Sequence, residues 1–444
     1  MSTGQVGRWQ NWSASVKSAP QAVMKPSSLQ DLANLIRTYA QEGRHVRVVG
    51  AGHSFTPIVY TDDVLISLDN MQGIESIDAE HNYVTVWGGT RLHKLGNDLL
   101  AKGLAQENLG DIDVQSIAGA ISTGTHGTGI RFGTIPTQVV GLTLVTASGD
   151  ILECSETDKP EIFKAAQTSL GLLGIVAKVT LRVVPAKRLH YKGHRERLSS
   201  VLANLERYKQ ENSHFEFLWF PNTDWVQAKF INETGEPVTK TNFLSTLNKI
   251  VLENWVYWLL SEMCRIAPPF SATCSKISAA GVAKIDEVDY SHRLFATPRM
   301  VKFQEMEYNL PAEHAPEVIR RIDATIKQHH INVHFPVECR FVRGDDIWLS
   351  PAYQRDSTYI AVHMFKGMAY TNYFRQVEVI HREHEGRPHW GKMHTQDYRT
   401  LSQLYPRWAD FLNIRQQLDP HGMFLNDYLR ETFGVEASEA IQEA

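Results

Sequence analysis

Two glycine-rich segments in the N-terminal half limit what this chain can fold around. The first, Val49-Gly50-Ala51-Gly52-His53-Ser54, directly follows an apolar run over residues 46–49 that predicts a β-strand. The second, Ser116–Gly129, consists almost entirely of small residues and holds four glycines. Small side chains let a large ligand approach the backbone, whose N–H groups can then bind phosphates. Each segment alone could be a turn or a tight chain crossing, but two of them together favour a nucleotide site.

The first segment lacks a GxGxxG pattern, and no amphipathic helix opens directly after it. A Rossmann fold places the pyrophosphate at such a helix terminus. We therefore expect the phosphates to lie in a loop built from backbone N–H groups.

Helical and strand patterns follow one another along the chain and predict an α+β protein of more than one domain. The length of 444 residues exceeds what one hydrophobic core usually holds. From residue 186 onward, a predicted helix at Glu196–Lys209 and a strand–helix–strand unit within 303–342 indicate an antiparallel sheet flanked by helices. We divide the chain into a first domain (1–185), a second domain (186–400) and a C-terminal segment (401–444) that packs back toward the first.

Composition argues against several classes of partner. The net charge is −4 and no basic stripe is present, so we expect no nucleic-acid partner. The four cysteines (Cys154, Cys264, Cys274 and Cys339) are scattered and form no CxxC pair, so their spacing predicts neither a disulfide framework nor a zinc site. We expect no bound metal. A reducing compartment fits this cysteine usage.

The N-terminus shows no signal-peptide pattern, and the expectation is a cytoplasmic protein. The most apolar stretch, Leu244–Phe270, is interrupted by charged residues and reads as a buried or surface-lying helix. Membrane contact through this stretch is possible but not predicted. His381 and His384 lie one helical turn apart in His-Arg-Glu-His, which is not a known zinc-hydrolase spacing, so a metal-dependent hydrolase is a weak alternative.

Six motifs together resemble one enzyme family. The two glycine-rich segments and Leu170–Val176 (LGLLGIV) look like the FAD domain of the vanillyl-alcohol-oxidase superfamily. Pro336–Phe341 resembles the Glu-x-Arg signature of aldonolactone oxidases, Arg387–Lys392 their His-Trp-Gly-Lys signature, and Leu418–Phe424 their C-terminal tail. The similarity covers most of the chain and is weakest between about 235 and 295. It is closest to the L-gulono-1,4-lactone oxidases, with D-arabinono-1,4-lactone and alditol oxidases as near relatives.

The resemblance implies a two-lobed PCMH-type FAD-binding domain and a cap domain that carries the Glu-x-Arg and His-Trp-Gly-Lys motifs. FAD would be bound covalently through an 8α-histidyl bond to His53, for which neutral imidazole is a suitable nucleophile. The flavin contacts implied by the resemblance are Val49, Gly50, Ala51, Gly52, His53, Ser54, Ser116, Gly119, Ile121, Gly124, His126, Gly127, Thr128, Gly129, Ile175, Val176 and Lys392.

The resemblance also assigns catalytic roles. Glu338 and Arg340 lie two apart in an apparent strand, so both side chains should share one face, with Cys339 on the other. Glu338 would take the proton of the substrate hydroxyl, and Arg340 would bind substrate oxygens and stabilise negative charge on reduced flavin. Lys392 would stabilise the same charge from the edge of the flavin. Gly110 would leave room for oxygen beside the reactive carbon.

The expected reaction is the FAD-dependent oxidation of an aldono-1,4-lactone at its C2 hydroxyl. Molecular oxygen would be the acceptor, and the products would be an ascorbate-type compound and hydrogen peroxide, as in ascorbate biosynthesis. Two related activities stay open: an alditol oxidase acting on polyols, and a lactone dehydrogenase that uses another acceptor. A flavin carrier without catalysis fits poorly, because passive binding needs no Glu338, Arg340 and Lys392 together.

Overall fold

The N-terminal part of the chain forms two small sheets, and the predicted α+β class is confirmed. In the computed structural model, which describes residues 7–240, 255–296 and 301–436, a three-stranded parallel sheet has the order β3–β5–β4. The bounds are β3 Ala22–Met24, β4 Val46–Val49 and β5 Val64–Ser67. Helix α1 (Leu29–Gln41) covers this sheet and begins where the Ser28 hydroxyl accepts a bond from the Asp31 N–H.

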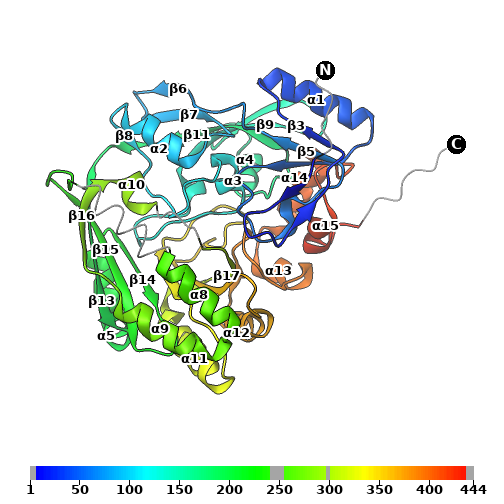
Figure 1. Ribbon diagram of the computed structural model, residues 1–444. Helices are drawn as coiled ribbons and strands as arrows, with labels where there is room; N and C mark the ends of the chain where they lie inside the picture. The colour runs from blue at the N-terminus through cyan, green and yellow to red at the C-terminus, as the bar shows by residue number, and fades with distance from the viewer. Residues whose placement is uncertain (1–6, 241–254, 297–300, 437–444) are drawn as a thin grey trace.

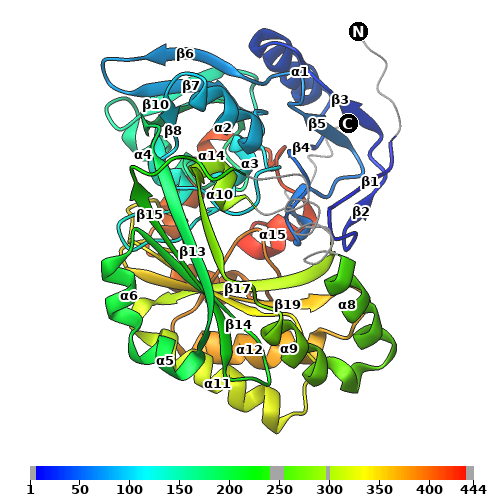
Figure 2. The same cartoon turned by 60° about the vertical axis from the view of Figure 1, so that its left-hand side comes forward.

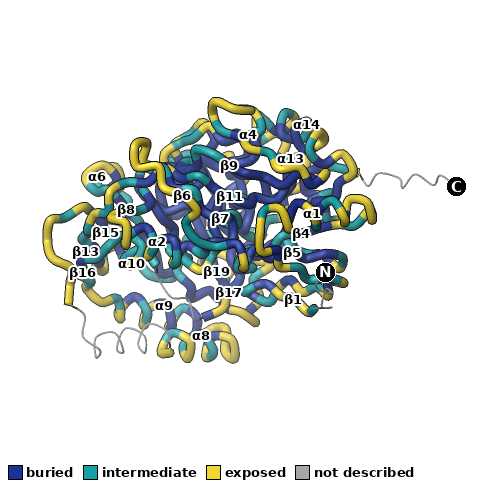
Figure 3. Tube along the Cα trace, turned by 90° about the horizontal axis from the view of Figure 1, so that it is seen from above, coloured by how far each residue is buried: buried dark blue, intermediate teal, exposed yellow. Residues whose placement is uncertain are grey.

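The second sheet of this lobe has five antiparallel strands in the order β10–β9–β11–β7–β6. Its strands are β6 Ile74–Asp78, β7 Tyr83–Trp87, β9 Val139–Val145, β10 Ile151–Ser155 and β11 Ile175–Arg182. Helices α2 (Leu92–Leu100), α3 (Ile117–Ser122) and α4 (Pro160–Ala166) pack against it. Seen from above, β9 and β11 lie in the buried interior of the lobe (Figure 3).

An eight-stranded antiparallel sheet dominates the other lobe, in the order β16–β13–β15–β14–β18–β19–β17–β20. Figure 2 shows it lying between the N-terminal lobe and a layer of helices. Its strands are β13 Arg188–Arg197, β14 His214–Trp219, β15 Trp225–Thr234, β16 Ile285–Tyr290, β17 Phe303–Pro311, β18 Val337–Val342, β19 Ser357–Phe365 and β20 Arg387–Pro388.

The two faces of this sheet differ in chemistry. On one face, Phe217, Cys339 and Ile360 follow one another across three strands and pack into the hydrophobic core. The flanking helices are α5 Leu198–Ala203, α6 Leu205–Glu211, α8 Tyr257–Ile266, α9 Ser271–Ala280, α11 Ala315–Gln328 and α12 Thr371–Glu383. On the opposite face, the same alternation presents Glu338 and, two strands away, Glu307. The polar face therefore points toward the N-terminal lobe.

The helix predicted over Glu196–Lys209 is only partly correct. Strand β13 runs to Arg197, and the helical region begins at Leu198. Leu189, Tyr191 and Gly193 are buried at alternate positions of that strand, but the many charged residues between them hide the period of two. The strand predicted over residues 46–49 is present as β4.

The last part of the chain returns to the N-terminal lobe (Figure 1). Helices α13 (Tyr398–Leu404), α14 (Trp408–Leu418) and α15 (Asp427–Phe433) share a hydrophobic core with α2 and α4. The Val46 N–H donates to the Met423 carbonyl, so the chain also continues the edge of the parallel sheet. Within the part of the chain that is described, none of the helices combines the length and apolar character needed to cross a bilayer.

Candidate active site

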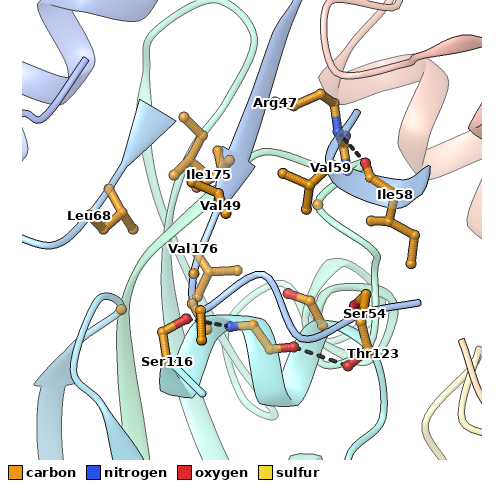
Figure 4. A pocket seen from close by; sticks show the side chains of 18 of the residues that line it. Arg47, Val49, Ser54, Ile58, Val59, Leu68, Ser116, Thr123, Ile175 and Val176 are labelled. Atoms are coloured by element: carbon orange, nitrogen blue, oxygen red, sulfur yellow. Dashed lines mark hydrogen bonds between the residues drawn. The ribbon is translucent and has the colours of Figure 1, made fainter. Parts of the chain in front are cut away.

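The two glycine-rich segments meet at the wall of one large cavity. Its empty volume, including the part open to solvent, is about 960 Å³. Figure 4 shows the wall, where Val49, Ser116 and Val176 approach from β4, the start of α3 and β11. Ten predicted cofactor contacts line it: Val49, Gly50, Ala51, Gly52, His53, Ser54, Ser116, Gly119, Ile175 and Val176.

Close backbone approach explains the glycines of this wall. A Cβ atom built on Gly50 would lie 2.2 Å from the Ser116 Oγ atom, so a side chain there would force the two segments apart. The same holds at Gly88, where a Cβ would lie 2.2 Å from the Val176 carbonyl oxygen. The Ser116 hydroxyl also accepts a bond from the Gly119 N–H and thereby caps helix α3. Part of the second segment is therefore a short helix, which sequence patterns did not predict.

A buried arginine braces the far side of the cavity. The Arg47 guanidinium donates to the carbonyl oxygens of Ile58, Phe424 and Leu170, which come from three separate segments. Burial lowers the pKa of Arg47 to about 10, which still leaves it charged at neutral pH. Three of its five N–H donors bond these carbonyl oxygens, so Arg47 ties the three segments together at the cavity wall.

A second, smaller cavity of about 440 Å³ adjoins the first and shares His53, Ser54, Gln115 and Thr123 with it. Its far wall carries Glu305 on β17, together with His389 and Lys392 from the His-Trp-Gly-Lys motif. The sequence motif and strand β17 thus converge on the end of the large cavity where His53 lies. Lys392 thus lines the smaller cavity.

His53 is held as a neutral imidazole. Burial, followed by the positive charge of Lys392, lowers the pKa of His53 to about 4. Its ring stacks on Trp12 with 5.3 Å between ring centroids. A neutral ring at cellular pH keeps a nitrogen lone pair, which is the property that a nucleophilic or metal-binding histidine needs.

Lys392 forms a buried ion pair. Its Nζ atom lies 2.5 Å from a Glu305 carboxylate oxygen, and the other Glu305 oxygen lies 3.3 Å from the His363 Nε2 atom. Burial alone would lower the pKa of Lys392, but Glu305 and Glu307 outweigh it and raise the pKa. The lysine is therefore positively charged at the cavity wall, and Glu305 fixes its position.

The Glu-x-Arg pair lies on the same polar sheet face as Glu305 and Glu307. The Arg340 guanidinium lies 2.7 Å from Glu338, 2.8 Å from Glu216 and 3.4 Å from Asp111. Asp111 belongs to the N-terminal lobe, so Arg340 links the two lobes. The alternation predicted for this strand is confirmed, since Cys339 packs in the core behind it. Among the described residues, the linings of the two cavities do not include Glu338 or Arg340.

The second half of the second glycine-rich segment lies at the junction of the lobes. His126 stacks on Tyr359 with 3.5 Å between centroids, and its Nε2 atom lies 3.2 Å from Glu307. The Thr128 hydroxyl donates to the Phe215 carbonyl. These residues fasten the N-terminal lobe to the large sheet. The predicted cofactor contacts outside both cavity linings, as far as these are described, are Ile121, Gly124, His126, Gly127, Thr128 and Gly129.

Gly110, the residue expected to admit oxygen, packs against the chain itself. A Cβ atom on Gly110 would lie 3.0 Å from the His126 carbonyl oxygen, and Gly110 is not among the described residues that line either cavity. The space at Gly110 is limited by the backbone of His126, which lies at the junction of the lobes.

Sequence reasoning missed part of the site. Glu305 and Glu307 stand at alternate positions of an apolar strand, the same pattern that singled out Glu338 and Arg340, and this signal could have found them. The doublet Gly88-Gly89 directly follows β7 and carried a similar signal. Phe424 and Trp12 reach the cavities only through the fold, from opposite ends of the chain.

Comparisons with known proteins agree with this arrangement. Residues 179–432 match the family described as D-arabinono-1,4-lactone oxidase, and residues 20–155 match an FAD binding domain. The chain is 39% identical to an L-gulono-1,4-lactone dehydrogenase of Mycobacterium tuberculosis, over 96% of this chain and 99% of the relative. It is 34% identical to an L-gulonolactone oxidase of Scyliorhinus torazame, over 98% and 100%.

A solved structure confirms the fold class. Cholesterol oxidase from Brevibacterium sterolicum superposes with a TM-score of 0.80 at 17% identity, covering 96% of each chain. At that identity the likeness concerns the fold alone, a PCMH-type FAD-binding lobe with a second lobe built on an antiparallel sheet. The fold and the family predicted from the motifs are both confirmed.

The contact between the glycine-rich segments generates a prediction. Gly50→Ala should lower the free energy of unfolding by about 1–3 kcal/mol, because its Cβ would overlap the Ser116 hydroxyl. The matched control is Gly235→Ala, where a Cβ would meet nothing within 4 Å and the change should stay within about 0.5 kcal/mol. Urea unfolding of both variants measures this. Equal stability of the two variants would contradict the close approach.

Proposed function

The chain belongs to the D-arabinono-1,4-lactone oxidase family, and from this premise we propose that it oxidises the C2 hydroxyl of an aldono-1,4-lactone. L-gulono-1,4-lactone or a close analogue is the proposed substrate, and an ascorbate-type compound is the proposed product. The observation that carries the proposal is the junction at His53, where the cavity walled by the glycine-rich segments meets a smaller one lined by Glu305 and Lys392.

FAD fits the larger cavity by the chemistry of its wall. Backbone and small side chains line it, and the glycines at positions 50 and 88 let the chain come closer than any side chain would allow. When bound, FAD supplies the hydride acceptor of the reaction. His53 would hold it covalently, and the neutral state of that imidazole supports the assignment.

Glu338 is the proposed proton acceptor, and Arg340 the proposed anchor for substrate oxygens. A guanidinium held by three carboxylates keeps one orientation, since each contact removes rotational freedom. Those carboxylates also raise the pKa of Arg340 well above its ordinary value, against the effect of burial. The positive charge beside Glu338 favours its carboxylate form, which is the form that can take a proton.

Lys392 places a positive charge at the wall of the smaller cavity. Glu305 holds the Lys392 ammonium group in place, and the two charges partly cancel. Lys392 and Glu305 therefore form an oriented ion pair at the cavity wall. Such an arrangement binds the polar edge of a ligand without moving during the reaction.

The electron acceptor is proposed to be molecular oxygen, which would leave as hydrogen peroxide. The relatives divide on this point, because one is named a dehydrogenase and the other an oxidase. The name of the oxidase relative supports oxygen, whereas Gly110 gives no support, because its close contact with the His126 carbonyl oxygen accounts for a glycine there. A dehydrogenase that uses another acceptor is the second candidate, favoured by the name of the mycobacterial relative.

The role of Glu338 gives the first functional prediction. Glu338→Gln should lower kcat by roughly 100- to 10,000-fold with L-gulono-1,4-lactone, because the amide cannot accept the proton. Flavin content, read from the absorption spectrum, should stay unchanged. Glu233→Gln, an exposed carboxylate on β15, serves as the control. Near-normal turnover of the Glu338 variant would refute the role.

The proposed covalent bond between His53 and FAD gives the second functional prediction. After acid denaturation and centrifugation, yellow colour and flavin fluorescence should stay in the pellet of the wild-type protein. In His53→Ala the flavin should appear in the supernatant, because no other bond retains it. Free flavin from the wild-type protein would exclude the covalent bond while leaving FAD dependence intact.

The proposed use of molecular oxygen as electron acceptor gives the third functional prediction. Turnover of the lactone in air should release peroxide at a rate comparable to the rate with a dye acceptor under nitrogen. A dye-dependent rate with little peroxide in air would identify a dehydrogenase. Replacing the lactone with xylitol or sorbitol in the same assay distinguishes a polyol oxidase.

A further inference from the structure

Three side chains of metal-ligand type converge in the core of the second lobe. Cys264 lies in α8, Cys274 in α9, and His334 in the turn that precedes β18. The two sulfur atoms and a ring nitrogen of His334 all lie within 4.8 Å of one another. All three side chains are completely buried, with 0% exposure. The fold thus assembles a cluster that the spacing of the cysteines gave no reason to expect.

The hydrogen bonds of His334 define its tautomer. The Ser261 hydroxyl donates its hydrogen to the Tyr257 carbonyl at 2.8 Å, so the same oxygen accepts from the His334 Nε2–H at 3.0 Å. The proton is therefore on Nε2, and Nδ1 carries a lone pair. Within residues 7–240, 255–296 and 301–436, this buried Nδ1 atom has no hydrogen-bond partner. A buried acceptor without a donor costs free energy, and a bound cation would satisfy it.

This arrangement matches that of a metal-binding histidine, which commonly donates its second ring N–H to an oxygen and thereby fixes its tautomer. The other group of possible ligands differs in this respect. His126 and His389 contact Glu307 or backbone groups, and the His389 Nδ1 atom accepts from the Gly391 N–H. That group is an occupied hydrogen-bond network at the lobe junction.

We propose that Cys264, Cys274 and the Nδ1 atom of His334 bind one zinc ion, contrary to the expectation drawn from cysteine spacing. In tetrahedral sites zinc lies about 2.3 Å from sulfur and about 2.0–2.1 Å from nitrogen, which places two sulfurs about 3.8 Å apart. The observed cluster therefore needs only small side-chain movements. A water molecule would take the fourth position.

Charge balance favours the ion in this apolar surrounding. Binding releases the two thiol protons, and Zn²⁺ with two thiolates and a neutral imidazole has no net charge, so burial is not penalised as it would be for an isolated ion.

The site would connect the α8–α9 hairpin to the strand that carries the Glu-x-Arg pair, because His334 precedes Glu338 by four positions. The role is structural, and it holds whether or not the proposed lactone activity is correct. For this reason the test does not use activity as its readout.

The test measures zinc in the flavin-loaded enzyme, expressed with zinc and purified without chelator. Elemental analysis should give close to one zinc per chain in the wild type and in Cys154→Ser, the matched control, because Cys154 is buried far from the cluster. Cys264→Ser and His334→Gln should each retain less than about a tenth of that amount, since two ligands bind zinc weakly. X-ray absorption at the zinc edge should show sulfur and nitrogen ligands in the wild type.

Several results would overturn the proposal. One is a wild-type protein that retains no zinc after supplementation, and another is zinc bound only by oxygen and nitrogen, which marks a surface ion. Peptide mapping that finds Cys264 joined to Cys274 as a disulfide would do the same. If the variants do not fold, X-ray absorption at the zinc edge of the wild-type protein still shows whether sulfur and nitrogen bind the ion.

Discussion

The structure depends on pairing buried charges between its two lobes. An isolated charge in a protein interior is costly, and the cost is offset only when the partner and the remaining hydrogen bonds are well placed. Here the large sheet brings the Arg340 guanidinium to the lobe junction, where Asp111 of the N-terminal lobe meets it. His126 of that lobe likewise meets Glu307 of the sheet. The lobes are thus held in one relative position, and the smaller cavity, which adjoins the larger one, is lined by residues of both lobes.

That pairing also explains why the site is rigid. Arg340 contacts carboxylates from two strands, Glu216 on β14 and Glu338 on β18, and Lys392 contacts Glu305 on β17, so each cation is held by ion pairs. Charges that stay fixed during a reaction stabilise developing charge without reorganising, which is the larger part of electrostatic catalysis. The neutral His53 beside them completes the junction, because Lys392 and burial together disfavour its protonated form.

Local sequence patterns predicted the elements well where the signal is short-range. Strand β18 and its division into Glu338 and Arg340 on one face and Cys339 on the other follow from alternation alone. The cavity wall at Gly50 was also predicted from a local pattern, a glycine-rich segment that directly follows a strand. Long-range packing was not predictable. The sequence around His126 does not distinguish a residue that contacts a cofactor from one that holds the two lobes together. The grouping of Cys264 with His334 depends on how α8 packs against the segment that precedes β18. Charged residues between buried ones also hid the end of β13.

The central claim is that a sugar lactone reduces a flavin held at the His53 junction. Adding L-gulono-1,4-lactone to the purified enzyme without oxygen tests it most directly, because no acceptor has to be assumed. The account predicts that the visible absorption of oxidised flavin disappears within the mixing experiment and returns when an acceptor is admitted. A flavin that dithionite bleaches but that no aldonolactone bleaches would contradict it.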